Sequence, residues 1–185
     1  MSKVIVFTCS PRRKGTTAAL LKEVAKGAES KGAQIVEIDM NMSGVKGCQA
    51  CNACAKPDAE PICIQNDPLK PMYKELAEAD GIVVGSPIYM GGLTAQCWLL
   101  INRLRPVATS SPTFTPRIPG LNYATVITHA NTEEGRYQEQ VDYLQGQLAR
   151  RGWNSVGSLV WAGADGEPSD ELKQAAFAAG EKLVK

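Results

Sequence analysis

Four of the six cysteines lie close together in the chain. They are Cys48, Cys51, Cys54 and Cys63, in the spacing C-x2-C-x2-C-x8-C. Two-residue gaps turn the first three thiols of a tight loop toward one point, as in loops that ligate iron–sulfur clusters. A chain of 185 residues can form a hydrophobic core, and clustered cysteines in such a chain more often bind metal or do redox work than form disulfides. We therefore expect a [4Fe–4S] cluster, with Cys63 as its fourth ligand.

Two other interpretations of these cysteines stay open. The four thiols suit a tetrahedral zinc ion, although zinc sites more often use two separated C-x2-C pairs. They also suit reduced, unligated residues, since free cysteine commonly behaves as a small hydrophobic side chain. Eight residues separate Cys54 from Cys63, and Pro57 and Pro61 are among them, so the fourth thiol follows a stiff insertion.

A polar segment near the N-terminus carries a second candidate site. Its candidate binding residues are Ser10, Arg12, Gly15, Thr16 and Thr17. The hydroxyl groups and the guanidinium are donors, the glycine allows close backbone approach, and a following helix adds unpaired amides, all of which suit a phosphate. The segment has neither the G-x-G-x-x-G nor the Walker pattern, and hydroxyl donors favour a terminal phosphomonoester. An ordinary polar turn before a helix is the alternative.

A third segment suits a planar ring. Its candidate residues are Ser86, Pro87, Ile88, Tyr89, Met90 and Gly91. The proline fixes a turn, the glycine permits close approach, and the tyrosine and methionine offer flat or polarisable surface. In a doubly wound sheet this segment lies beside the phosphate segment, at the switch point of the strand order. Together the two segments predict a flavin site.

Five short apolar runs alternate with amphipathic segments along the chain. The runs are residues 4–7, 34–39, 81–85, 124–128 and 156–161. Four of them are nearly continuous, as expected of parallel strands buried on both faces, whereas 34–39 alternates and predicts an edge strand. This order predicts an α/β doubly wound sheet of five parallel strands, in order 2-1-3-4-5, with helices on both faces.

Helical spacing separates the apolar runs. Tyr137, Val141, Leu144 and Leu148 follow one apolar stripe, and similar stripes occur after the first and the fifth run. Asp67-Pro68 has the form of an N-cap followed by proline at the first helical position, which predicts a helix running to about residue 79.

Composition and charge exclude several classes of protein. Twenty lysines and arginines against nineteen acidic residues give a formal charge of +1, which is no footprint for nucleic acid or an anionic membrane. No apolar run approaches the roughly 18 residues of a membrane helix, and the first residues have no signal-peptide pattern. We expect a cytoplasmic protein with one domain, residues 1–185, and a cysteine-rich insertion at about 42–66.

The motifs resemble a known family. Ser10-Pro11-Arg12…Gly15…Thr17, and Ala79-Asp80-Gly81 leading into Gly85-Ser86-Pro87-Ile88-Tyr89, are similar to the NAD(P)H-dependent FMN reductase family of flavodoxin-like proteins. With the cysteines between them, the chain more narrowly resembles the iron–sulfur flavoproteins of that group, from Val4 to about Arg105. The resemblance implies FMN, with its phosphate at the first segment and its ring against Pro87–Gly91. It also implies a homodimer or a tetramer.

The segment after the fourth run, Thr128–Gly135, lacks the glycines that the resembled family carries there. It contains His129, the only histidine, which either donates to the flavin or a bound substrate or is a strand-end histidine satisfied by the backbone. The remaining cysteines and the three tryptophans have no spacing that indicates a site. We expect Cys9 and Cys97 to be packing residues, and Trp98, Trp153 and Trp161 to pack in the core or at an interface.

Three functions follow from these observations. The first is an FMN-dependent oxidoreductase, an iron–sulfur flavoprotein that transfers electrons between FMN and the cluster, with NAD(P)H or a ferredoxin-like protein as electron donor. The second is an NAD(P)H-dependent FMN or quinone reductase without a cluster. The third is a flavodoxin-like binding or regulatory module stabilised by zinc. No residue stands out as a general acid or base.

Overall fold

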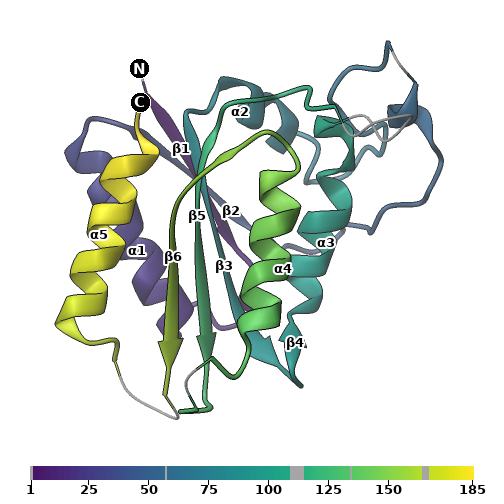
Figure 1. The fold of residues 1–185 in the computed structure, drawn as a ribbon. Coiled ribbons are helices and arrows are strands. Elements are labelled where there is room, and N and C mark those ends of the chain that lie inside the picture. Colours follow the sequence, from purple (N-terminus) through teal and green to yellow (C-terminus); the bar gives the residue numbers. More distant parts are fainter. Residues whose placement is uncertain (1, 57, 109–114, 134, 164–166) are drawn as a thin grey trace.

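The computed structural model describes residues 2–56, 58–108, 115–133, 135–163 and 167–185, and its centre is a twisted sheet (Figure 1). The strands are β1 (Lys3–Thr8), β2 (Gln34–Asp39), β3 (Gly81–Tyr89), β4 (Gly92–Leu93), β5 (Asn122–His129) and β6 (Asn154–Ala162). The helices are α1 (Thr16–Ser30), α2 (Met72–Glu78), α3 (Ala95–Arg103), α4 (Gln138–Ala149) and α5 (Asp170–Leu183), with short 3₁₀ turns at Ala53–Ala55 and Arg105–Val107.

The five long strands are parallel and lie in the order β2-β1-β3-β5-β6. The predicted doubly wound architecture is therefore confirmed, but the described residues contain six strands rather than five. The strand missed from the sequence is β4, which pairs antiparallel with the end of β3. Met90 and Gly91 join the two strands, with φ of 50° and 80°, which is the left-handed backbone of a tight two-residue hairpin.

Helices cover both faces of the sheet, as predicted (Figure 1). Strand alternation sends Ile5 and Phe7 into the core shared with α2, α3 and α4, and Val4 and Val6 into the core shared with α1 and α5. The alternating run 34–39 is an edge strand, as expected. The run 156–161 belongs to the opposite edge strand, β6, and its expected burial on both faces is wrong, since Val160 is 39% exposed.

The helix expected to begin at Asp67-Pro68 begins instead at Met72. Pro71 has no backbone N–H to donate to the Asp67 carbonyl, so residues 68–71 form turns rather than the first turn of a helix. The Asp67 carboxylate still accepts the backbone N–H of Leu69, at 3.2 Å. Within the described part of the chain, no helix has both the length and the apolar character that crossing a bilayer requires.

Candidate functional site

A cavity of about 260 Å³ opens at the carboxyl edge of the sheet, where ligands of doubly wound folds bind. It is lined by Ser10, Arg12, Gly15, Thr16, Thr17, Pro87, Ile88, Tyr89, Thr128, His129, Ala130, Trp161 and Gly163. Nine of the twelve residues predicted to bind the flavin are in this set. The structure therefore brings both predicted segments to one cavity, although they are about 70 residues apart in the chain.

One end of the cavity has the features of an anion site. The start of α1 at Gly15 carries no side-chain cap and no acidic residue in its first turn, so its amides and partial positive charge are available to a ligand. The Ser10 hydroxyl accepts the Arg12 N–H at 3.1 Å, which folds the preceding loop toward the helix. Buried Thr17 and Thr128 share a hydroxyl hydrogen bond of 2.7 Å, which ties α1 to the end of β5.

The other end of the cavity is apolar and aromatic. Pro87, Ile88 and Tyr89 line it from the last residues of β3, and Trp161 lines it from β6. The backbone of Gly163 lies so close to Trp161 that an added Cβ would be 2.7 Å from the indole ring. The same cavity thus combines hydroxyl-bearing residues with apolar and aromatic ones.

Three predicted flavin residues do not line this cavity. Ser86 is fully buried, and its hydroxyl contacts Pro87 and Thr94 inside the protein. Met90 is fully exposed, because the hairpin that it forms with Gly91 projects into solvent. The sequence predicted a loop after residue 85, whereas the structure has the β3–β4 hairpin there.

His129 lies in the wall of the cavity and is mostly buried. Its Nδ1 is 2.8 Å from the Asn131 carbonyl oxygen, which can only accept, so Nδ1 carries a proton. The ring meets Tyr137 edge-on, with centroids 4.9 Å apart. The backbone contact expected of a strand-end histidine is present, and the same side chain also faces the ligand space.

Sequence reasoning missed Thr128, Ala130, Trp161 and Gly163 as cavity residues. Ala130 and Gly163 directly follow β5 and β6, and Thr128 and Trp161 lie in the last two residues of these strands; this position at the carboxyl edge was the available signal. Trp161 was expected to be a packing residue. A single tryptophan in an apolar run has no sequence pattern that would distinguish a ligand contact from a core position. Cys9 and Cys97 are fully buried as expected, and burial raises the pKa of the Cys9 thiol.

The four clustered cysteines border a second, smaller cavity of about 20 Å³ beside the end of α3. All four are free thiols; Cys48 and Cys51 are exposed, and Cys54 and Cys63 are partly buried. Burial raises the pKa of Cys54, and the positive charge of Arg105 partly offsets this effect. In the described ranges, no three His, Cys, Asp or Glu side chains lie close enough to hold a metal ion.

The backbone of the cysteine loop is unusual at two positions. Ala50 and Asn52 lie between the first three cysteines and have left-handed backbone, with φ of 52° and 59°. Such strain in residues other than glycine is concentrated at ligand clamps. Four thiols around one cavity, beside the cations of Arg103 and Arg105, are a donor set that fits an iron–sulfur cluster.

Comparison with known families decides the classification. Residues 2–140 match the model of the family described as NADPH-dependent FMN reductase, which is most of the chain. The chain belongs to this family. The hydroxyl-bearing and the apolar residues of the carboxyl-edge cavity fit a flavin mononucleotide.

Relatives of the family include proteins named iron–sulfur flavoproteins. One from Methanocaldococcus jannaschii is 35% identical over 105 residues, covering 57% of this chain and 53% of the relative. One from Archaeoglobus fulgidus is 25% identical over 183 residues, covering 98% and 79%. The chain thus matches about half the length of the first relative. These relatives agree with the predicted iron–sulfur flavoprotein branch.

Solved structures agree with the fold. A structure described as an NAD(P)H:quinone oxidoreductase from Methanothermobacter marburgensis has a TM-score of 0.71 at 14% identity, covering 98% of this chain and 96% of that one. At this identity the likeness concerns the flavodoxin-like fold alone.

Proposed function

We propose that the protein is an FMN-containing redox protein that passes electrons between FMN and a [4Fe–4S] cluster held by Cys48, Cys51, Cys54 and Cys63. The observation that carries the proposal is the pair of cavities: one joins a phosphate-type helix N-terminus to an aromatic wall, and the other gathers four thiols. Family membership supports the first half, and the names of the relatives support the second.

In this proposal, different residues of the carboxyl-edge cavity bind the phosphate and the ring system of FMN. Ser10, Arg12 and the start of α1 bind the phosphate, where hydroxyls, a guanidinium and free amides meet. Tyr89 and Trp161 hold the ring system. FMN supplies hydride and electron chemistry that no side chain here provides, so the protein contributes binding, orientation and electrostatics. NAD(P)H or a ferredoxin-like protein is the electron donor in this proposal.

The two cavities lie at opposite ends of α3. Thr94, which caps the start of α3, lies next to Ser86 behind the flavin cavity, and Arg103 at the end of α3 lines the cysteine cavity. Nine helical residues span about 13 Å at ~1.5 Å rise per residue. In this proposal the protein is a homodimer or a tetramer.

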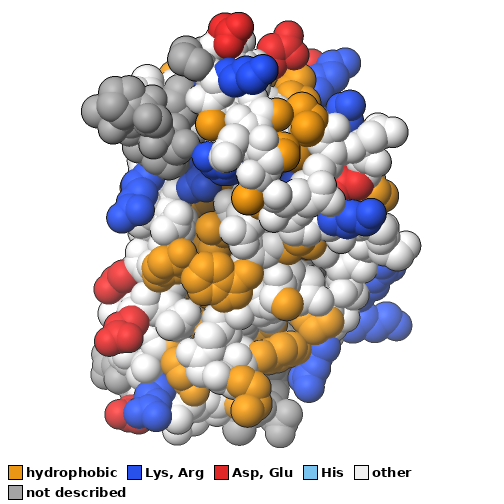
Figure 2. All heavy atoms as spheres, turned by 90° about the vertical axis from the view of Figure 1, so that its right-hand side faces the viewer, with side chains coloured by type: hydrophobic (Ala, Val, Ile, Leu, Met, Phe, Trp, Pro, Cys, Tyr) orange, Lys and Arg blue, Asp and Glu red, His pale blue; other side chains and the backbone are white. Residues whose placement is uncertain are grey.

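An exposed apolar face supports the same homodimer or tetramer. Figure 2 shows apolar side chains gathered on the side of the molecule formed by α3 and α4. Trp98 of α3 and Tyr143 of α4 are 39% and 38% exposed, and their rings pack against each other with centroids 5.0 Å apart. Exposed aromatic pairs of this kind are typical of contact surfaces between protein chains.

The test is anaerobic purification followed by measurement of FMN, iron, sulfide and zinc content and the visible spectrum. We expect one FMN and about four irons per chain, with broad absorption that dithionite bleaches. Cys51→Ala should lose iron and keep FMN, because Cys51 does not line the flavin cavity. Cys97→Ala is the matched control, since it removes a thiol outside the cysteine cavity.

Each other outcome rejects part of the proposal. FMN without metal in the wild-type protein would leave an NAD(P)H-dependent FMN or quinone reductase. Stoichiometric zinc, with no iron and no turnover with any donor, would indicate a zinc-stabilised binding module. Loss of FMN together with iron in Cys51→Ala would contradict the separation of the two sites.

A further inference from the structure

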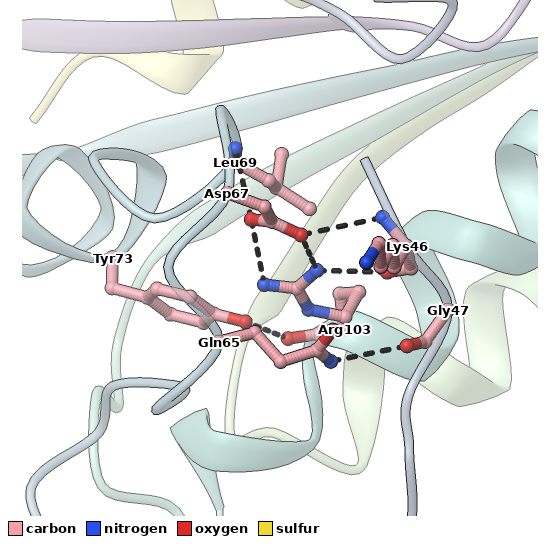
Figure 3. Close-up of polar contacts among 7 residues, drawn as sticks. All are labelled: Lys46, Gly47, Gln65, Asp67, Leu69, Tyr73 and Arg103. Carbon is pink, nitrogen blue, oxygen red and sulfur yellow. Dashed lines mark hydrogen bonds and ion pairs between the residues drawn. The ribbon is translucent and has the colours of Figure 1, made fainter. Parts of the chain in front are cut away.

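A buried ion pair lies beside the chain segments that precede and follow the four cysteines (Figure 3). Arg103 of α3 and Asp67 form it through both ends of the guanidinium, and their side chains are 1% and 7% exposed. Removing a guanidinium and a carboxylate from water is costly, and replacing such pairs by apolar residues is often neutral or stabilising. Fold stability alone therefore gives little reason for a charged pair at this position.

The pair closes the neck of the cysteine insertion, by which we mean Lys46, Gly47, Gln65 and Asp67. Arg103 Nη1 donates to the Lys46 carbonyl at 2.8 Å while the same guanidinium binds Asp67 (Figure 3). Asp67 in turn accepts the Lys46 N–H at 3.3 Å, and Gln65 Nε2 donates to the Gly47 carbonyl at 3.0 Å. The chain thus enters and leaves the insertion at one point.

Closure at this point acts on the four thiols together. Lys46 lies two residues before Cys48, and Asp67 lies four residues after Cys63, so one guanidinium grips the chain on both sides of all four cysteines. This closure returns Cys63 to the cavity bordered by the other three, although eight residues separate it from Cys54. The neck thus gives a structural reason why Cys63 can be the fourth ligand despite the eight residues between it and Cys54.

Arg103 also carries a donor without an acceptor. Its side chain lines the cysteine cavity, and its Nε is buried with no hydrogen-bond partner among the described residues. A buried N–H left unpaired costs free energy, so such groups call for an explanation. Anionic sulfur in the adjoining cavity would accept a hydrogen bond from this N–H, and the positive charge of the Arg103 guanidinium would offset the negative charge of the sulfur.

We propose that Arg103 is a positioning residue for the sulfur-ligated group of this protein: it closes the neck through Lys46 and Asp67 and donates Nε–H toward sulfur in the cysteine cavity. The inference rests on the proposed cluster function. Hydrogen bonds to cluster sulfurs raise the reduction potential, because they stabilise the more negative reduced state. Loss of outer partners of metal ligands typically lowers metal affinity roughly 10- to 100-fold.

The main test compares Arg103→Lys with the anaerobically purified wild-type protein. Lysine keeps the charge but has no planar fork to bridge Lys46 and Asp67, and it has no Nε–H. We expect iron to be lost to a chelator at a roughly 10- to 100-fold lower concentration, a lower midpoint potential for the iron that remains, and unchanged FMN content.

Arg151→Lys is the matched control. Arg151 is a buried arginine that donates to the backbone carbonyls of Ile101, Leu104 and Gln147 and does not line the cysteine cavity. It should retain iron as the wild-type protein does. Equal chelator resistance and equal potential in Arg103→Lys and the wild-type protein would overturn the proposal.

A double variant, Asp67→Asn with Arg103→Gln, covers the case in which Arg103→Lys fails to fold, because it leaves no unpaired buried charge. In iron-free protein it should show faster hydrogen exchange at the Lys46 and Leu69 amides, which Asp67 binds. Unchanged hydrogen exchange at these two amides would contradict the proposal that Arg103 and Asp67 close the neck. A wild-type protein without iron would refute the cluster function itself, and the inference with it, whereas a loaded wild type with equally loaded variants refutes the inference alone.

Discussion

The crossing of α1 and α5 sets a prediction whose size follows from the structure. Gly27 of α1 and Gly180 of α5 face each other's backbone. A Cβ added at Gly27 would be 1.9 Å from the Phe177 carbonyl oxygen, and one added at Gly180 would be 2.0 Å from the Val24 carbonyl oxygen. A backbone carbonyl cannot rotate away as a side chain can, so Gly27→Ala must push two helices apart.

The expected free-energy change is the difference between two terms. Overpacking costs roughly 1–3 kcal/mol, and a contact with fixed backbone belongs at the upper end of that range. Alanine in place of a glycine inside a helix returns about 1 kcal/mol. Gly27→Ala should therefore lower the free energy of unfolding by about 2 kcal/mol.

Gly146→Ala is the matched control, because this helical glycine of α4 has open space where a Cβ would be placed. It should raise the free energy of unfolding by roughly 0.5–1 kcal/mol. The assay is urea unfolding of FMN-free protein, so that bound cofactor does not shift the midpoint. The reasoning is refuted if Gly27→Ala unfolds within about 0.5 kcal/mol of wild type, or if both variants shift the midpoint in the same direction.

Two further predictions concern the sites. Arg12→Ala should weaken FMN binding roughly 10- to 150-fold, because it removes a hydrogen bond to a charged phosphate, and it should leave the iron content unchanged. Equilibrium dialysis with FMN measures the affinity. An unchanged affinity would exclude the phosphate role of Arg12. Although burial raises the pKa of Asp67, hydrogen bonds from Arg103 and Lys46 outweigh it and hold the pKa below its ordinary value of 3.8. The ionised carboxylate therefore stabilises the fold above that value, and its contribution is lost as the pH falls through 3.8 and below. The gap in unfolding free energy between wild type and Asp67→Asn should then narrow from pH 7 to about pH 3; a constant gap would contradict this coupling.

Local patterns predicted the elements that position the flavin site. Nearly continuous apolar runs mark β1, β3 and β5, because a strand buried on both faces has no polar side to show. The polar residues just after the first run were predicted to bind phosphate, and the start of α1 there is uncapped, as such a site requires. Both features are encoded within a few residues of chain, which is why sequence alone reveals them.

Residues predicted for the flavin site lie outside the cavity where a neighbour in space fixes their position. Ser86 belongs to a ligand-like motif, yet it is fully buried, and its hydroxyl contacts Thr94, the N-cap of α3, inside the protein. Met90 was expected at the ring, but the left-handed turn that starts β4 points it into solvent. No periodic pattern of residues in the sequence predicts the hairpin or its orientation.

The sequence by itself determined the fold class, the family resemblance and most of the cavity-lining residues, since apolar periodicity and short motifs are properties of contiguous chain. The tertiary structure alone decided that Trp161 and Gly163 complete the cavity wall, and that Arg103 closes the cysteine insertion from 36 residues beyond Asp67. Those contacts depend on the register of strands and the crossing of helices. Register and crossing are settled by packing across the whole core, and no local pattern records them.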